Sequence, residues 1–66
     1  MNAAELIYYE CMNNEEYFKA ACISETSSLG RDKVEAAANM ARKKYISEKK
    51  FLLAQYVTQR FNLDEK

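Results

Sequence analysis

The chain has 66 residues, of which 48% are hydrophobic and 30% are charged, and its formal net charge at pH 7 is zero. This length permits one domain, and the composition is that of a folded chain rather than a disordered one. The longest uninterrupted apolar run, residues 51–54, is far shorter than the about 20 residues of a membrane-spanning helix. The N-terminal sequence has no basic region, so we expect no secretory signal and a cytoplasmic protein.

The composition favours an all-α fold. The chain has no proline and a single glycine, and it is rich in good helix formers. Asn2 and Glu5 have the spacing of a capping box, which predicts a first helix over residues 3–25. Asn13 and Asn14 also resemble a helix start. The sequence therefore leaves open a break at that point, although one continuous helix is favoured.

Residues 26–31 are predicted to connect two helices, because hydroxyl side chains compete with the backbone for hydrogen bonds there. Gly30 can take the left-handed conformation that a tight return needs. Asp32 and Glu35 offer a second capping box, with Ser28 as an alternative cap, so the second helix is predicted over residues 32–62. The tail, residues 64–66, is expected to fray.

The second predicted helix carries apolar residues at helical spacing. They are Val34, Ala38, Ala41, Tyr45, Leu52, Tyr56 and Leu63. Beyond residue 50 the helix becomes apolar on several faces, which is typical of a helix with more than one neighbour. Apolar patches usually mark binding surfaces. The predicted partner or dimer interface consists of Phe51, Leu52, Leu53, Tyr56, Val57 and Phe61.

Helix lengths point to the same segment. The first helix would be about 35 Å long and the second about 46 Å, so roughly seven residues of the second helix would have no neighbour within the chain. A chain this small also gains little net stability from its own core. We therefore predict one domain spanning residues 1–66, an antiparallel helical hairpin with a long second helix, that dimerises into a four-helix arrangement.

Catalytic and metal chemistry find little support. The chain has no histidine, and Cys11 and Cys22 would lie some 16 Å apart on a continuous helix, beyond the reach of a disulfide. We interpret them as small apolar side chains in a reducing compartment. Glu15 and Glu16 would point to different faces of a helix. The sequence predicts a protein that is not an enzyme and needs no cofactor or metal.

Charge is unevenly divided along the chain. Residues 1–29 carry five acids and one base, a net of −4, and residues 30–66 carry nine bases and five acids, a net of +4. Two antiparallel helices of opposite charge would attract each other along their flanks. The alternative hypothesis is a nucleic-acid contact within the segment 42–50, with Tyr45 as a stacking group. Its phosphate-binding residues would be Arg42, Lys43, Lys44, Lys49 and Lys50.

These patterns predict a small non-catalytic protein–protein interaction module of the adaptor, inhibitor or co-chaperone type, such as phages, mobile elements or secretion systems encode. It would use an apolar, tyrosine-rich helix face. Its expected partners are itself and an unidentified protein. The alternative is a small nucleic-acid-associated regulator, and a third hypothesis is that self-association within a larger assembly is the whole role.

Overall fold

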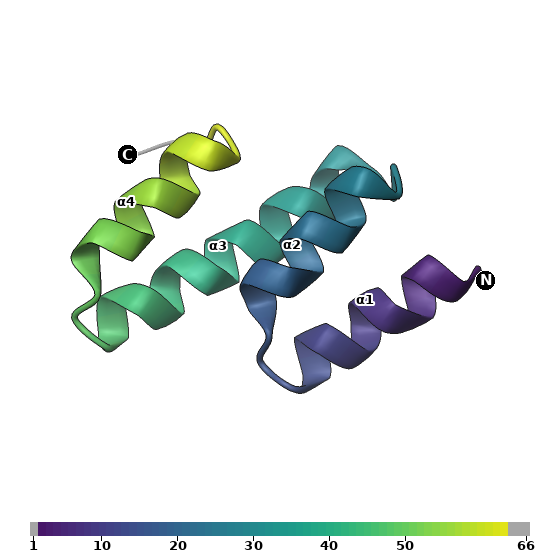
Figure 1. Cartoon of the computed structure of the whole chain (residues 1–66), viewed down its shortest axis with the longest axis horizontal. Helices are drawn as coiled ribbons and strands as arrows, with labels where there is room; N and C mark the ends of the chain where they lie inside the picture. Colours follow the sequence, from purple (N-terminus) through teal and green to yellow (C-terminus); the bar gives the residue numbers. More distant parts are fainter. Residues whose placement is uncertain (1, 64–66) are drawn as a thin grey trace.

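The computed structural model describes residues 2–63, which fold into four α-helices without a strand. Helix α1 spans Ala3–Asn13, α2 spans Tyr17–Thr26, α3 spans Arg31–Ser47 and α4 spans Phe51–Arg60. The helices lie in chain order, each packed against the next (Figure 1). Within the described range no helix is long and apolar enough to span a membrane. The predicted all-α class is confirmed, whereas the predicted fraying of residues 64–66 lies outside the described residues.

Both predicted long helices are interrupted, so the single hairpin was wrong. Residues 14–16 separate α1 from α2, and residues 48–50 separate α3 from α4. At each break the chain reverses direction, which gives two helical hairpins in succession (Figure 1). Because α4 folds back along α3, the predicted seven-residue overhang does not exist.

All four helices end in the same hydrogen-bonded motif. At the end of α1 the backbone N–H of Glu16 donates to the carbonyl of Cys11 at 2.8 Å, and that of Glu15 donates to Met12 at 3.2 Å. Glu15 itself has φ = 60°, so this is a Schellman motif with a left-handed residue after the helix. The same position is held by Ser28, Lys49 and Asn62 at the ends of α2, α3 and α4. None of the four is glycine, the residue that usually marks this motif.

The predicted helix starts are confirmed in part. Asn2 and Glu5 form the expected capping box, with Glu5 N–H donating to Asn2 Oδ1 at 2.8 Å. The second predicted box does not form, because α3 begins directly after Gly30 and Asp32 lies within its first turn. Gly30 has φ = 115° and is extended, so the left-handed position expected of it falls to Ser28.

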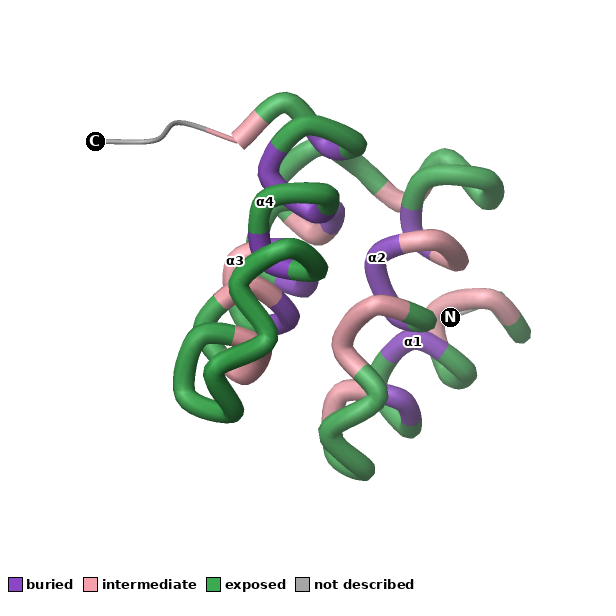
Figure 2. The backbone as a smooth tube through the Cα atoms, turned by 60° about the vertical axis from the view of Figure 1, so that its left-hand side comes forward, coloured by how far each residue is buried: buried purple, intermediate pink, exposed green. Residues whose placement is uncertain are grey.

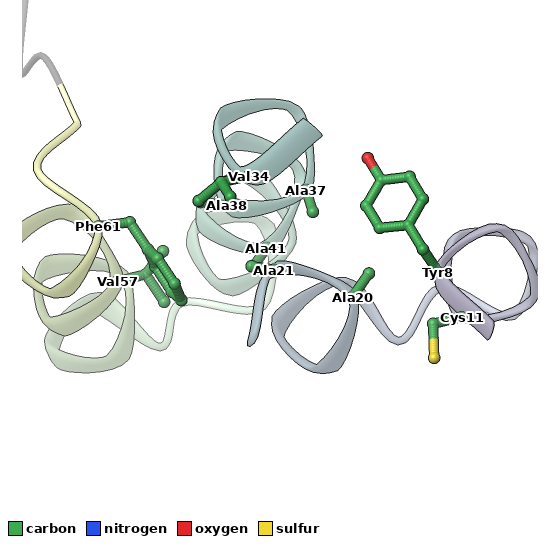
Figure 3. Close-up of a cluster of buried hydrophobic side chains, with 10 residues drawn as sticks. All are labelled: Tyr8, Cys11, Ala20, Ala21, Val34, Ala37, Ala38, Ala41, Val57 and Phe61. Atoms are coloured by element: carbon green, nitrogen blue, oxygen red, sulfur yellow. The ribbon is translucent and has the colours of Figure 1, made fainter. Parts of the chain in front are cut away.

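The core is built around a seam of small residues between α2 and α3. Ala20 and Ala21 of α2 face Ala37 and Ala41 of α3 (Figure 3), and each is at most 3% exposed. Small side chains let the two backbones approach closely, and the interior is close-packed there. Larger side chains close the two ends of the seam: Tyr8 and Cys11 from α1, and Val57 and Phe61 from α4.

The two hairpins are equivalent at a spacing of 34 residues. Glu15 and Lys49 have φ of 60° and 61°, and Ser28 and Asn62 have φ of 53° and 54°. We name residues 3–29 the first repeat and residues 37–63 the second repeat, and we call residues 34 positions apart counterparts. Only four of the 27 counterpart pairs are identical.

Buried side chains follow the same register. Ser24 in the first repeat and Thr58 in the second are both buried, and each donates its hydroxyl to a carbonyl one turn earlier at 2.9 Å. Ala20 and its counterpart Ala54 are both buried. A spacing of 34 residues lies in the range of helix–turn–helix repeats that stack side by side. The chain therefore consists of two stacked repeats.

Candidate interaction surface

Helix α4 is buried on one face and apolar on the other. Its inner face places Ala54, Val57 and Thr58 against the rest of the chain. On the opposite side Leu52 is 82% exposed and Tyr56 is 50% exposed, and Phe51 beside them is 61% exposed. We call these three residues the outer face of α4. Figure 2 shows α4 with exposed segments alternating with buried ones, as expected for a helix with one covered side.

The predicted interface residues thus separate into two groups. Phe51, Leu52 and Tyr56 form the outer face, and Leu53 at its edge is 45% exposed. Val57 and Phe61, in contrast, lie in the core of the single chain at 0% and 1% exposed, so the structure does not place them on a surface. The turn at residues 48–50 shifts the helical phase, which moves Leu52 and Tyr56 out of the predicted core stripe and brings Val57 into the core.

Contacts at its C-terminal end hold α4 in place. Arg31, at the start of α3, donates to the backbone carbonyls of Phe61 and Asn62. Carbonyls at a helix C-terminus lack partners within the helix and carry partial negative charge, so a guanidinium stabilises them. Phe18 of α2 packs its ring 6.0 Å from that of Phe61 and 6.1 Å from that of Tyr56. These contacts fix the side of α4 that remains outward.

An ion pair ties the same end of α4 to α2. The guanidinium of Arg60 donates two hydrogen bonds to the carboxylate of Glu25, at 2.7 and 3.1 Å. Hydrogen bonding to Arg60 lowers the pKa of Glu25 below its ordinary value. The bidentate geometry adds orientation to attraction. The pair connects the two repeats at their second helices.

A surface groove of ≈ 420 Å³ lies between the C-terminal half of α3 and α4. We call it the α3–α4 groove, and it is lined by Arg42, Lys43, Ile46, Phe51, Ala54, Gln55 and Thr58. The counterparts of these residues in the first repeat are Tyr8, Tyr9, Met12, Tyr17, Ala20, Ala21 and Ser24. That matching surface of the first repeat is not open, because α3 packs on it.

The five residues of the nucleic-acid hypothesis do not share one groove. Arg42 and Lys43 line the α3–α4 groove, whereas Lys44 and Lys50 line another groove, next to α2. Lys44 donates to the backbone carbonyl of Glu15 at 3.1 Å. Lys50 pairs with Glu48 at 3.3 Å. Lys49 is exposed in the turn between α3 and α4.

Helix α1 has an exposed apolar surface that was not predicted. Leu6 is 59% exposed and Ile7 is 46% exposed, while Tyr8 turns inward and donates its hydroxyl to the carbonyl of Lys33 at 3.1 Å. Burial raises the pKa of Tyr8. The signal was present in the sequence: Leu6, Ile7, Tyr8 and Tyr9 are consecutive, so they cannot all lie on one face of a helix.

The groups with reactive chemistry are few. Cys11 is buried, and burial raises the pKa of the half-buried Cys22 thiol, so at neutral pH it stays a thiol rather than the nucleophilic thiolate. Nowhere in residues 2–63 do three His, Cys, Asp or Glu side chains gather as metal ligands would. Comparisons of the chain with protein-family models, curated proteins and solved structures found no match.

Proposed function

We propose that this chain is a small non-catalytic module that binds protein through the outer face of α4, as adaptors and inhibitors do, and that it associates with a second copy of itself. The single observation that carries the proposal is Leu52, a leucine that is 82% exposed in the middle of the outer face. Tyr56 lies one helical turn further along on the same side. A helix held rigidly by Arg31 and Phe18 presents them together.

Physical chemistry explains why such a face favours a partner. Each Å² of apolar surface removed from water contributes on the order of 25 cal/mol. Aromatic side chains at the centre of a contact contribute most, because they combine a large area with few rotatable bonds. Phe51 and Tyr56 supply the aromatic rings, and their helix is already folded, so binding orders little additional chain.

Light scattering of the purified chain with matched variants tests the proposal. Leu52→Asp places a charge at the centre of the outer face, and we expect it to return the protein to the mass of one chain. Ala36→Asp, which places the same side chain at an exposed position of α3, should leave the association unchanged. Equal association of both variants would overturn a contact through α4.

A further inference from the structure

We propose that the occupant of the α3–α4 groove is helix α1 of a second copy of the chain, so that copies stack head to tail as the two repeats stack within one chain. The inference rests on the proposed function, a protein contact made through α4, and adds the partner segment and its geometry. Three observations carry it: the shape of the groove, the face of α1, and the distribution of charge.

The groove matches a surface that already binds a helix. In the first repeat, the counterparts of the groove residues carry α3: Ala20 and Ala21 pack in the seam, and Tyr8 donates to the carbonyl of Lys33. In the second repeat, Ala54 remains the buried floor, and Phe51 replaces Tyr17 at the rim. The groove therefore has the form of a seat for a helix that packs as α3 does.

Helix α1 presents the face that such a seat receives. The α3 residues buried in the seam are Ala37 and Ala41, at 0% and 3% exposed. Their counterparts in α1 are Ala3 and Ile7. Both are exposed, as is Leu6 beside them. The face that α3 buries against the first repeat is thus left uncovered on α1. Because Ile7 is larger than Ala41, we expect the two copies to approach less closely than α2 and α3 do.

Charge complementarity is preserved with the signs exchanged. Within the chain, Lys44 of α3 meets Glu15 in the turn before α2, with 4.0 Å between Nζ and the carboxylate and 3.1 Å to the backbone carbonyl. The counterpart of Lys44 in α1 is Glu10, and the counterpart of Glu15 is Lys49. Head-to-tail docking therefore brings Glu10 of one copy to Lys49 of the other, an opposite pair at the same place.

The whole-chain charge distribution favours the same arrangement. Residues 1–29 have a net charge of −4 and residues 30–66 a net charge of +4. Stacking α1 of one copy on α4 of another joins an acidic end to a basic end, whereas joining two α4 faces brings two basic ends together. A head-to-tail contact uses two different surfaces, so each added copy offers a free groove for the next one.

Mixing one-sided variants tests the inference. Phe51→Asp damages only the groove, and Ile7→Asp damages only α1, so each alone should remain a single chain in sedimentation velocity. Mixed in equal amounts, they should form a dimer that grows no further, because one intact groove and one intact α1 remain. Leu53→Asp is the matched control. The counterpart of Leu53 is the exposed Lys19, outside the stacking contact, and this variant should associate as the unaltered chain does.

The outcomes separate the inference from the proposed function. If Phe51→Asp prevents association while Ile7→Asp does not, the head-to-tail arrangement is overturned and a contact through α4 is retained. If the unaltered chain does not associate, both are overturned.

A second pair of variants avoids the core altogether. Glu10→Lys and Lys49→Glu, both at exposed positions, should each weaken association several-fold at low salt. The double variant should restore it, and a double variant as weak as either single one would overturn the arrangement.

Discussion

Glu15 and Lys49 take the same left-handed backbone conformation, with φ of 60° and 61°, at positions 34 residues apart. Each ends the first helix of a repeat and reverses the chain into the second. The side chains have opposite charge, so the backbone is conserved between the two repeats while the surface chemistry is inverted. This relationship underlies both the fold and the proposed stacking of copies.

The left-handed turns predict an unusual response to glycine. Glu15→Gly should raise the free energy of unfolding by about 0.5–1 kcal/mol, because a residue with a Cβ is strained at this φ and glycine is not. Glu15→Val should lower it, since β-branched residues fit this region worst. Urea unfolding followed by circular dichroism measures both. Destabilisation by glycine would contradict the assigned turn.

The prediction of fold class succeeded, and that of the helix boundaries did not, for a local reason. Asn2 and Glu5 carry a capping signal that the structure confirms. The breaks at Glu15 and Lys49 carry none, because both residues are good helix formers in isolation and the left-handed conformation is imposed by tertiary packing. The helical wheel was therefore continued through residue 49 with the wrong phase.

The same phase error divided the predicted interface. Leu52 and Tyr56 were assigned to the core stripe as well as to the interface, and the structure exposes them. The repeat was missed because few counterparts are identical; comparing residue character at a spacing of 34, as for Ile23 with Val57 and Ser24 with Thr58, is the signal that reveals it.

The revised core predicts a large difference between two aromatic residues of the C-terminal segment. Phe61→Ala should cost about 3–5 kcal/mol, because Phe61 is 1% exposed and its removal leaves a cavity. The whole chain is expected to have about 3–10 kcal/mol of stability, so this variant should be largely unfolded. Tyr56→Ala should cost much less. Thermal unfolding at low protein concentration compares them, and equal losses would count against the burial of Phe61.

The small-residue seam predicts intolerance of larger side chains. Ala37→Leu should destabilise the fold by about 1–3 kcal/mol, since Ala37 is 0% exposed between α2 and α3. Ala36→Leu, the adjacent exposed position on α3, is the control and should be within about 0.5 kcal/mol of the unaltered chain. Chemical denaturation gives both values. A seam that accepts Ala37→Leu without loss would show that α2 and α3 do not pack closely.

The ion pair between Glu25 and Arg60 predicts a pH-dependent contribution to stability. Because hydrogen bonding to Arg60 lowers the pKa of Glu25 from its ordinary value of 4.5, the folded state binds this proton more weakly than the unfolded state. The contribution is therefore fully present above the ordinary pKa and is lost as the pH falls through the lowered one. Glu25→Gln should be less stable than the unaltered chain at pH 7 and equally stable in acid.

Because both side chains are partly exposed, salt should reduce the same difference. Thermal unfolding of the two proteins across pH and salt concentration makes the comparison. A stability difference that persists unchanged below pH 3 would assign the effect to something other than the charge of Glu25.

Sedimentation equilibrium of the unaltered chain over a range of concentrations tests the central claim most directly, because it needs no variant and no added partner. We predict an apparent mass that rises with concentration from the 7.7 kDa of one chain and passes beyond twice that value, as open-ended stacking requires. An apparent mass that stays at 7.7 kDa into the millimolar range would contradict the account.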